Sequence, residues 1–138
     1  MLLEERVDVI VGSHPHVVQP IVTVTVDRGG RPFTGYVAYS LGNLVSTQVW
    51  RYSDSGLLLY VDIERDATGA RVTGVRYLPV YVQRCWEDGR RAYRVVPVSS
   101  DIAPIWTPAP MEADRQRMKQ VGEELSLLLG GQVGVTAR

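Results

Sequence analysis

The chain has 138 residues, of which 45% are hydrophobic and 22% are charged, as is ordinary for one globular domain with a modest core. Fifteen basic residues balance fifteen acidic ones, so the net charge gives no indication of nucleic acid or an anionic membrane as partner. The single cysteine, Cys85, excludes an internal disulfide and a zinc site built from cysteines.

Six apolar runs have the length and composition of β-strands, at residues 7–12, 20–27, 34–41, 55–65, 72–84 and 92–99. The β-branched residues of the first run predict a buried strand. Glycine-containing turns such as DRGGR, residues 27–31, join most of the others, which favours antiparallel hairpins. Pro79 interrupts the fifth run and therefore indicates an edge position or a β-bulge.

Helical patterns stand at both ends of the chain. Residues 1–6 resemble the last turns of a helix, and residues 111–130 predict an amphipathic helix that Gly130 and Gly131 end as a C-cap pair. The apolar stripe of this second helix recurs at spacings of three and four residues: Met118, Val121, Leu125 and Leu128. Between the strands and this helix, the proline-rich segment 99–110 is expected to form an extended cover over the sheet.

These elements predict one domain over residues 1–138, of the α+β or α/β class, with a β-rich core over residues 1–98. No apolar run approaches the roughly 18 to 20 residues of a membrane-spanning helix. The first twelve residues lack a basic stretch followed by an uninterrupted apolar one, so we predict a soluble chain without a signal peptide.

Both histidines of the chain, His14 and His16, flank Pro15 directly after the first apolar run. In an extended segment, residues two apart face the same side, so the two imidazoles can meet at one metal ion or at two neighbouring ions. Pro15 favours extended backbone at His14, and imidazole is a common ligand of zinc, iron and manganese. A zinc site needs at least three protein ligands, and the chain has no third histidine. The pair is therefore an incomplete metal site or a polar loop at a strand end.

Two stretches, DVIVGSHPHVVQPI and YVAYSLGNLV, resemble the C-terminal part of the CapA family of poly-γ-glutamate capsule biosynthesis proteins, within the calcineurin-like metallophosphoesterase superfamily. The family pattern Gly-x-His-Pro-His-x-x-Gln is met by Gly12, His14, Pro15, His16 and Gln19. A Tyr-Ser-Leu-Gly-Asn stretch follows at residues 39–43. The resemblance covers about residues 1–64 well. Thr47 departs from it, because an aspartate often stands there in the family.

The resemblance implies an α-β-β-α sandwich fold in which His14 and His16 are ligands of two divalent ions, manganese, zinc or iron. Asn43 would bind substrate or hold the metal loop, and the alternative is a turn residue that tolerates left-handed backbone. The family's earlier metal-binding segments are not in this sequence. The chain is therefore expected to be the C-terminal portion of a longer protein at the bacterial cell envelope, with an anionic polymer or a phosphoryl-type substrate.

Whether the isolated chain is an enzyme stays open, and inactivity is the expectation because ligands are missing. One alternative is a non-catalytic β-rich interaction or scaffold module that has lost the metal centre. Another is a homo-oligomer, in which a second copy completes the site. Ser40 has no histidine nearby in sequence and is not in a nucleophile elbow, and Cys85 is expected to be an inert thiol.

Overall fold

The computed structural model describes residues 2–67, 69–98, 111–130 and 135–137. The expected cover at residues 99–110 and the second glycine of the expected helix cap lie outside the described residues. The elements in chain order are η1 (Leu2–Glu5), β1 (Val9–Val11), β2 (Ile21–Asp27), β3 (Pro32–Ala38), β4 (Ser55–Asp66), β5 (Gly69–Glu87), β6 (Arg90–Pro97), α1 (Glu112–Leu129) and β7 (Val135–Ala137).

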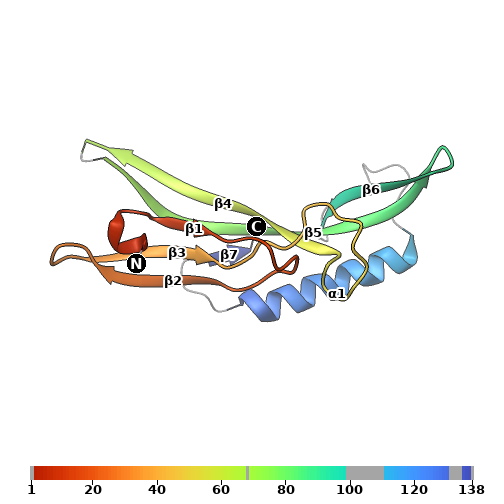
Figure 1. Cartoon of the computed structure of the whole chain (residues 1–138), viewed down its shortest axis with the longest axis horizontal. Coiled ribbons are helices and arrows are strands. Elements are labelled where there is room, and N and C mark those ends of the chain that lie inside the picture. Colours follow the sequence, from red (N-terminus) through yellow and green to blue (C-terminus); the bar gives the residue numbers. More distant parts are fainter. Residues whose placement is uncertain (1, 68, 99–110, 131–134, 138) are drawn as a thin grey trace.

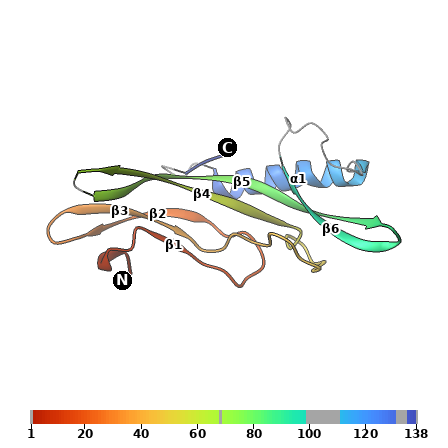
Figure 2. The same ribbon diagram turned by 90° about the horizontal axis from the view of Figure 1, so that it is seen from above.

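The strands form two sheets that lie as neighbouring layers (Figures 1 and 2). The first has the order β1-β3-β2, with β1 parallel and β2 antiparallel to β3. The second has the antiparallel order β4-β5-β6, and β7 pairs with β5 in parallel. The predicted antiparallel hairpins and the C-terminal helix are confirmed. The two parallel pairings were not foreseen, because they join strands that are far apart in the sequence.

The start of the chain differs from its prediction. η1 is a single 3-10 turn and not the end of an α-helix. β1 is three residues long and is not a buried strand, since Val11 is 52% exposed. The physical reason is the position of β1 at the edge of its sheet, where it pairs with β3 alone.

Glycines shape the hairpin turns as the sequence predicts. Gly29 and Gly30, between β2 and β3, have φ angles of 65° and 83°. The Gly30 amide donates a hydrogen bond to the Asp27 carboxylate at 2.8 Å, which satisfies one backbone group of the turn. Asp88 and Gly89, between β5 and β6, are also left-handed, as a two-residue hairpin turn of type I′ requires.

Pro79 lies in the middle of the 19-residue strand β5, the central strand of its sheet, and not at an edge or in a bulge. Its partner on β4, Leu57, donates its amide to Leu41 on the far side, so this pair exchanges no ladder hydrogen bond. On the other side, the Pro79 carbonyl accepts from the Val98 amide. On this second side of β5, the pairing with β7 ends at Tyr77, two residues before Pro79. The pairing with β6 begins at Val80, one residue after it. The missing amide of Pro79 therefore lies just beyond the end of the β6 pairing, where the single bond it cannot donate is the one back to Val98.

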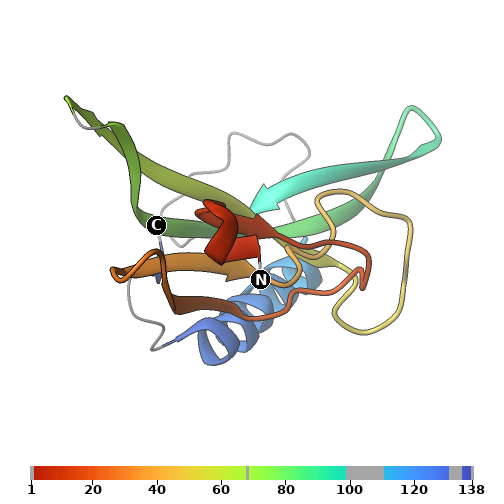
Figure 3. The same ribbon diagram turned by 60° about the vertical axis from the view of Figure 1, so that its left-hand side comes forward.

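One core joins both sheets to α1, which runs along one side of the strands (Figures 1 and 3). Val121, Leu125 and Leu129 of the helix are buried against residues of both sheets. Leu128, predicted to lie in the apolar stripe, is instead 38% exposed. At 100° per residue, Leu128 lies about 60° from the centre of the buried face, at the margin of the stripe. Gly130 follows the helix as expected, with extended backbone.

Two buried or half-buried carboxylates attach α1 to the strands. Asp114, 8% exposed, accepts hydrogen bonds from the Tyr81 hydroxyl at 3.0 Å, the Gln83 amide at 3.1 Å and the Met111 backbone amide at 3.1 Å. Asp54, in the loop before β4, receives two hydrogen bonds from Arg117, at 2.8 and 2.9 Å. The helix is therefore held by directed polar contacts as well as by its apolar face.

The Asp54–Arg117 pair predicts a pH-dependent contribution to stability. Burial favours the neutral carboxyl of Asp54, but the hydrogen bonds and charge of Arg117 outweigh this and lower its pKa below the ordinary value. A carboxyl whose pKa is lowered by folding stabilises the protein above its unfolded-state pKa, about 3.9, and loses that contribution as pH falls through the folded value. We expect Asp54→Asn to cost about 1 kcal/mol at pH 6, because the pair is partly exposed, and progressively less below pH 4.

Urea denaturation of both proteins at pH 6, 4 and 3 measures this difference. Glu112→Gln, which removes an exposed carboxylate paired with Arg115, is the matched control and should change little at any pH. A cost of Asp54→Asn that stays constant down to pH 3 would contradict the assignment.

Candidate functional site

The histidine loop, residues 12–19, leaves the sheet at the end of β1. Gly12 donates its amide to the Ala38 carbonyl at 2.7 Å, and a Cβ at Gly12 would lie 2.3 Å from the Tyr39 carbonyl oxygen. The loop must therefore begin with glycine. It returns to the segment that follows β3 through a bridge between Val18 and Leu41.

The backbone of this loop is not the extended segment that the sequence predicts. His14 has a φ angle of 107° and His16 one of 61°, on either side of Pro15. Such conformations cost about 1 to 3 kcal/mol each for residues other than glycine, and they persist where surrounding contacts impose them. Here the loop is fixed at both ends, by the bond from Gly12 to Ala38 and by the bridge between Val18 and Leu41.

Although the backbone differs from the prediction, the two imidazoles lie together on the surface. Both side chains are exposed, their ring centroids are 6.4 Å apart, and the ring planes are tilted by 41°. A single tetrahedral ion with metal–nitrogen bonds of about 2.0 Å would hold two ring centroids about 5 Å apart. The observed separation is wider than that, so the two rings are not arranged around one such ion.

Asn43 connects the histidine loop to the interior. Its side chain is 7% exposed, and Oδ1 lies 2.9 Å from Nδ1 of His16. Nδ2 donates to the Ser53 carbonyl at 2.8 Å and to Oε1 of Gln48 at 3.0 Å. Gly42, and not Asn43, supplies the left-handed turn, with a φ angle of 71°. Asn43 is therefore placed to hold the histidine loop, while its contact with substrate stays a prediction.

Sequence reasoning missed Gln48, Ser53 and Gly56 as parts of this site. A Cβ at Gly56 would lie 2.3 Å from the Asn43 carbonyl oxygen, so the start of β4 packs directly against the Asn43 backbone. Gln48 follows Thr47 where the resembled family commonly has an Asp-Gln pair, and this was the signal that could have pointed to it. Ser53 carries no motif, and its role arises only because two loops fold over the same asparagine.

Other residues considered from the sequence lie outside this arrangement. Asp8 pairs with Arg28 at 2.9 Å. Ser40 is buried and accepts a hydrogen bond from the Gly42 amide. The half-buried thiol of Cys85 lies 3.8 Å from the Ala92 carbonyl, in the β5–β6 hairpin. Within the described part of the chain, no three residues among His, Cys, Asp and Glu are grouped so that they could hold a metal ion.

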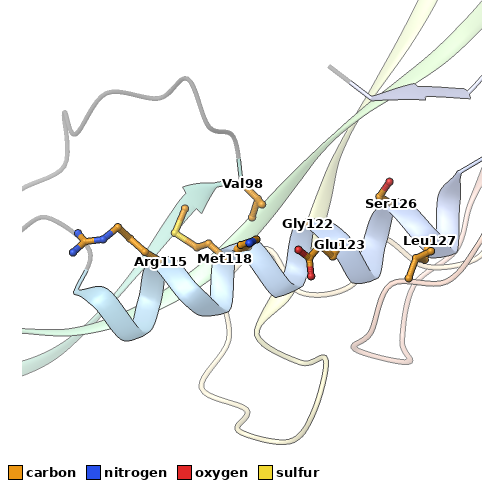
Figure 4. A pocket seen from close by; sticks show the side chains of 8 residues that line it. Val98, Arg115, Met118, Gly122, Glu123, Ser126 and Leu127 are labelled. Atoms are coloured by element: carbon orange, nitrogen blue, oxygen red, sulfur yellow. The ribbon is translucent and has the colours of Figure 1, made fainter.

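Two cavities lie near α1. A cavity of about 420 Å³ extends between the helix and the end of the histidine loop, and its lining includes Val17, Val18 and Leu125. The larger hollow, about 780 Å³, runs along the helix from Arg115 to Leu127 (Figure 4). The histidine pair lines neither of them, so neither cavity belongs to the candidate site. As for membrane association, the described segments contain no helix that is both apolar and long enough to cross a bilayer.

Comparison with known proteins bears on the segment that carries the site. Residues 1–48 match the family model of the bacterial capsule synthesis protein PGA_cap. Among curated proteins and solved structures, none matches the chain. The matched segment contains β1 to β3, both histidines and Asn43. Over its first third, the chain is therefore similar to bacterial capsule synthesis proteins, in agreement with its resemblance to the CapA family.

Proposed function

We propose that the chain is the C-terminal portion of a CapA-like capsule synthesis protein and supplies His14 and His16 to a dinuclear metal centre. The observation that carries the proposal is the pair of exposed imidazoles, 6.4 Å apart, within the segment that matches the capsule synthesis family. The centre would belong to a calcineurin-like metallophosphoesterase fold at the bacterial cell envelope. Its remaining ligands would come from residues outside this chain.

The residues present fit part of such a centre. His14 and His16 are neutral nitrogen donors of the kind that manganese, zinc and iron accept. When bound, the two ions would supply Lewis-acid polarisation of a phosphoryl-type or acyl-type group in an anionic substrate such as poly-γ-glutamate. In this proposal the histidines hold ions and transfer no protons. The glycine at the start of the loop permits its close approach to the strand beside it, and the asparagine beneath it holds the ring of His16.

Titration of the purified chain with Mn²⁺ and with Zn²⁺ tests the proposal, beside the double variant His14→Ala/His16→Ala. We expect the original chain to bind Zn²⁺ at least about tenfold more tightly than the double variant, since two imidazole ligands are lost. Cys85→Ser is the matched control, because it removes a half-buried thiol, which is another group that can bind Zn²⁺. It should bind like the original chain.

The stoichiometry separates the alternatives. Saturation at one ion or more per chain, together with dimerisation, would mean that a second copy completes the site. Equal, weak binding by the original chain and the double variant would overturn the proposal for this chain. The pair would then be at most half of a centre whose other ligands are missing, and the function would have to be sought in the full-length protein.

A further inference from the structure

We propose that Asn43 is a positioning residue that fixes the tautomer of His16, placing the proton on Nδ1 and leaving Nε2 as the atom that can ligate a metal. The metal part of this inference rests on the proposed function. The tautomer part rests on the hydrogen bonds of this chain alone.

The hydrogen bonds determine which atom of the Asn43 amide is which. A backbone carbonyl can only accept, and the Ser53 carbonyl lies 2.8 Å from Nδ2, so that atom must be the amide nitrogen. The other atom, Oδ1, can only accept, and it lies 2.9 Å from Nδ1 of His16. His16 must therefore donate through Nδ1. Because a neutral imidazole carries one proton, Nε2 is then unprotonated.

The reverse arrangement is disfavoured by burial. The Asn43 side chain is 7% exposed, and its second N–H donates to Oε1 of Gln48 at 3.0 Å. Its backbone amide donates to the Ser55 carbonyl at 3.1 Å, which fixes the main chain beneath the side chain. A flipped amide would place its oxygen against the Ser53 carbonyl oxygen with no proton between them. The orientation that imposes the Nδ1–H tautomer is therefore the satisfied one.

His14 provides an internal comparison. Within the described residues, no hydrogen bond from a side chain holds its ring, so none of these side chains selects one of its tautomers. The two histidines should thus differ in the tautomers of their rings, although they are two residues apart and both are exposed. In metal sites, a hydrogen bond to the second ring nitrogen orients the imidazole, and its removal typically weakens binding about 10- to 100-fold.

Long-range ¹H–¹⁵N correlation spectra of the metal-free chain, at a pH where both histidines are neutral, test the tautomer directly. We expect His16 to show the Nδ1–H pattern and His14 to show averaged ring shifts. Asn43→Ala should remove this difference. Val49→Ala, which truncates an exposed side chain of the same loop and leaves the contacts of Asn43 intact, should keep it.

The original chain alone can overturn the inference, so the test survives a failure of Asn43→Ala to fold. An Nε2–H pattern for His16 in the original chain would overturn it, whatever the metal affinity. Zn²⁺ titration then tests the metal part, with Asn43→Ala expected to bind about 10- to 100-fold more weakly than Val49→Ala. If His16 shows Nδ1–H but the chain binds no Zn²⁺ through its histidines, the proposed function fails and the tautomer assignment stands.

Discussion

Replacing Gly56 by alanine is expected to destabilise the chain by about 3 kcal/mol and to separate Asn43 from His16. The added Cβ would lie 2.3 Å from the Asn43 carbonyl oxygen, 2.8 Å from its carbonyl carbon and 3.1 Å from the Leu41 carbonyl oxygen. All three are backbone atoms, so no side chain can rotate away to make room. The start of β4 must therefore move away from the loop that carries Asn43.

Urea denaturation gives the change in the free energy of unfolding, and the ring shifts of His16 report its contact with Asn43. Gly122→Ala, the same substitution within α1, is the matched control, because its Cβ would meet only Cγ1 of Val98, at 3.2 Å. Alanine in a helix interior is favoured over glycine by about 1 kcal/mol, so this variant should be as stable as the original chain or more so. Equal stabilities for the two variants would show that the Gly56 contact is not restrictive.

Asp114→Ala is expected to cost about 3 kcal/mol, because one buried carboxylate accepts three hydrogen bonds. Its removal would leave the hydroxyl of Tyr81 and the side-chain amide of Gln83 without this acceptor. Gln83 is 2% exposed, and its own Oε1 already has no hydrogen-bond partner among the residues that the structure describes. The loss would therefore fall on groups that water reaches poorly, where an unmade hydrogen bond is most costly.

Urea denaturation measures this cost, and Glu112→Ala, which removes an exposed carboxylate two residues earlier, should change stability by less than about 0.5 kcal/mol. A second measurement is the alkaline absorbance titration of the tyrosines. Burial, and then the hydrogen bond and charge of Asp114, raise the pKa of Tyr81 above its ordinary value. In Asp114→Ala the pKa of Tyr81 should fall. An unchanged tyrosine titration together with unchanged stability would contradict the role given to Asp114.

Local patterns in the sequence predicted the hairpins and the helix correctly. Alternation at residues 21–27 and the paired glycines at Gly29 and Gly30 specify β2 and its turn through neighbouring residues alone. The same holds for α1, whose 3.6-residue periodicity places Val121 and Leu125 on one face. These features depend on steric and hydrogen-bonding preferences within a few residues, so they can be predicted without the fold.

Long-range pairing decided the features that the sequence mispredicted. Pro79 is tolerated in a central strand because β7, which comes from the far end of the chain, stops pairing before it and β6 starts pairing after it. Leu128 lies at the margin of the helix stripe because packing against both sheets sets the rotation of α1. In each case the outcome depends on which distant surface arrives beside the residue.

The features of the candidate site are also of two kinds, those that the sequence determines and those that tertiary contacts determine. By itself the sequence determined the two histidines, their spacing around Pro15 and the nearby asparagine stretch, because these are chemical identities and short separations along the chain. Only the tertiary structure decided the left-handed backbone of His14 and His16 and the hydrogen bond from His16 to Asn43, 27 residues away. The physical reason is that a hydrogen bond over such a separation forms only when two loops are closed against each other, and the packing of β1, β3 and β4 closes these two.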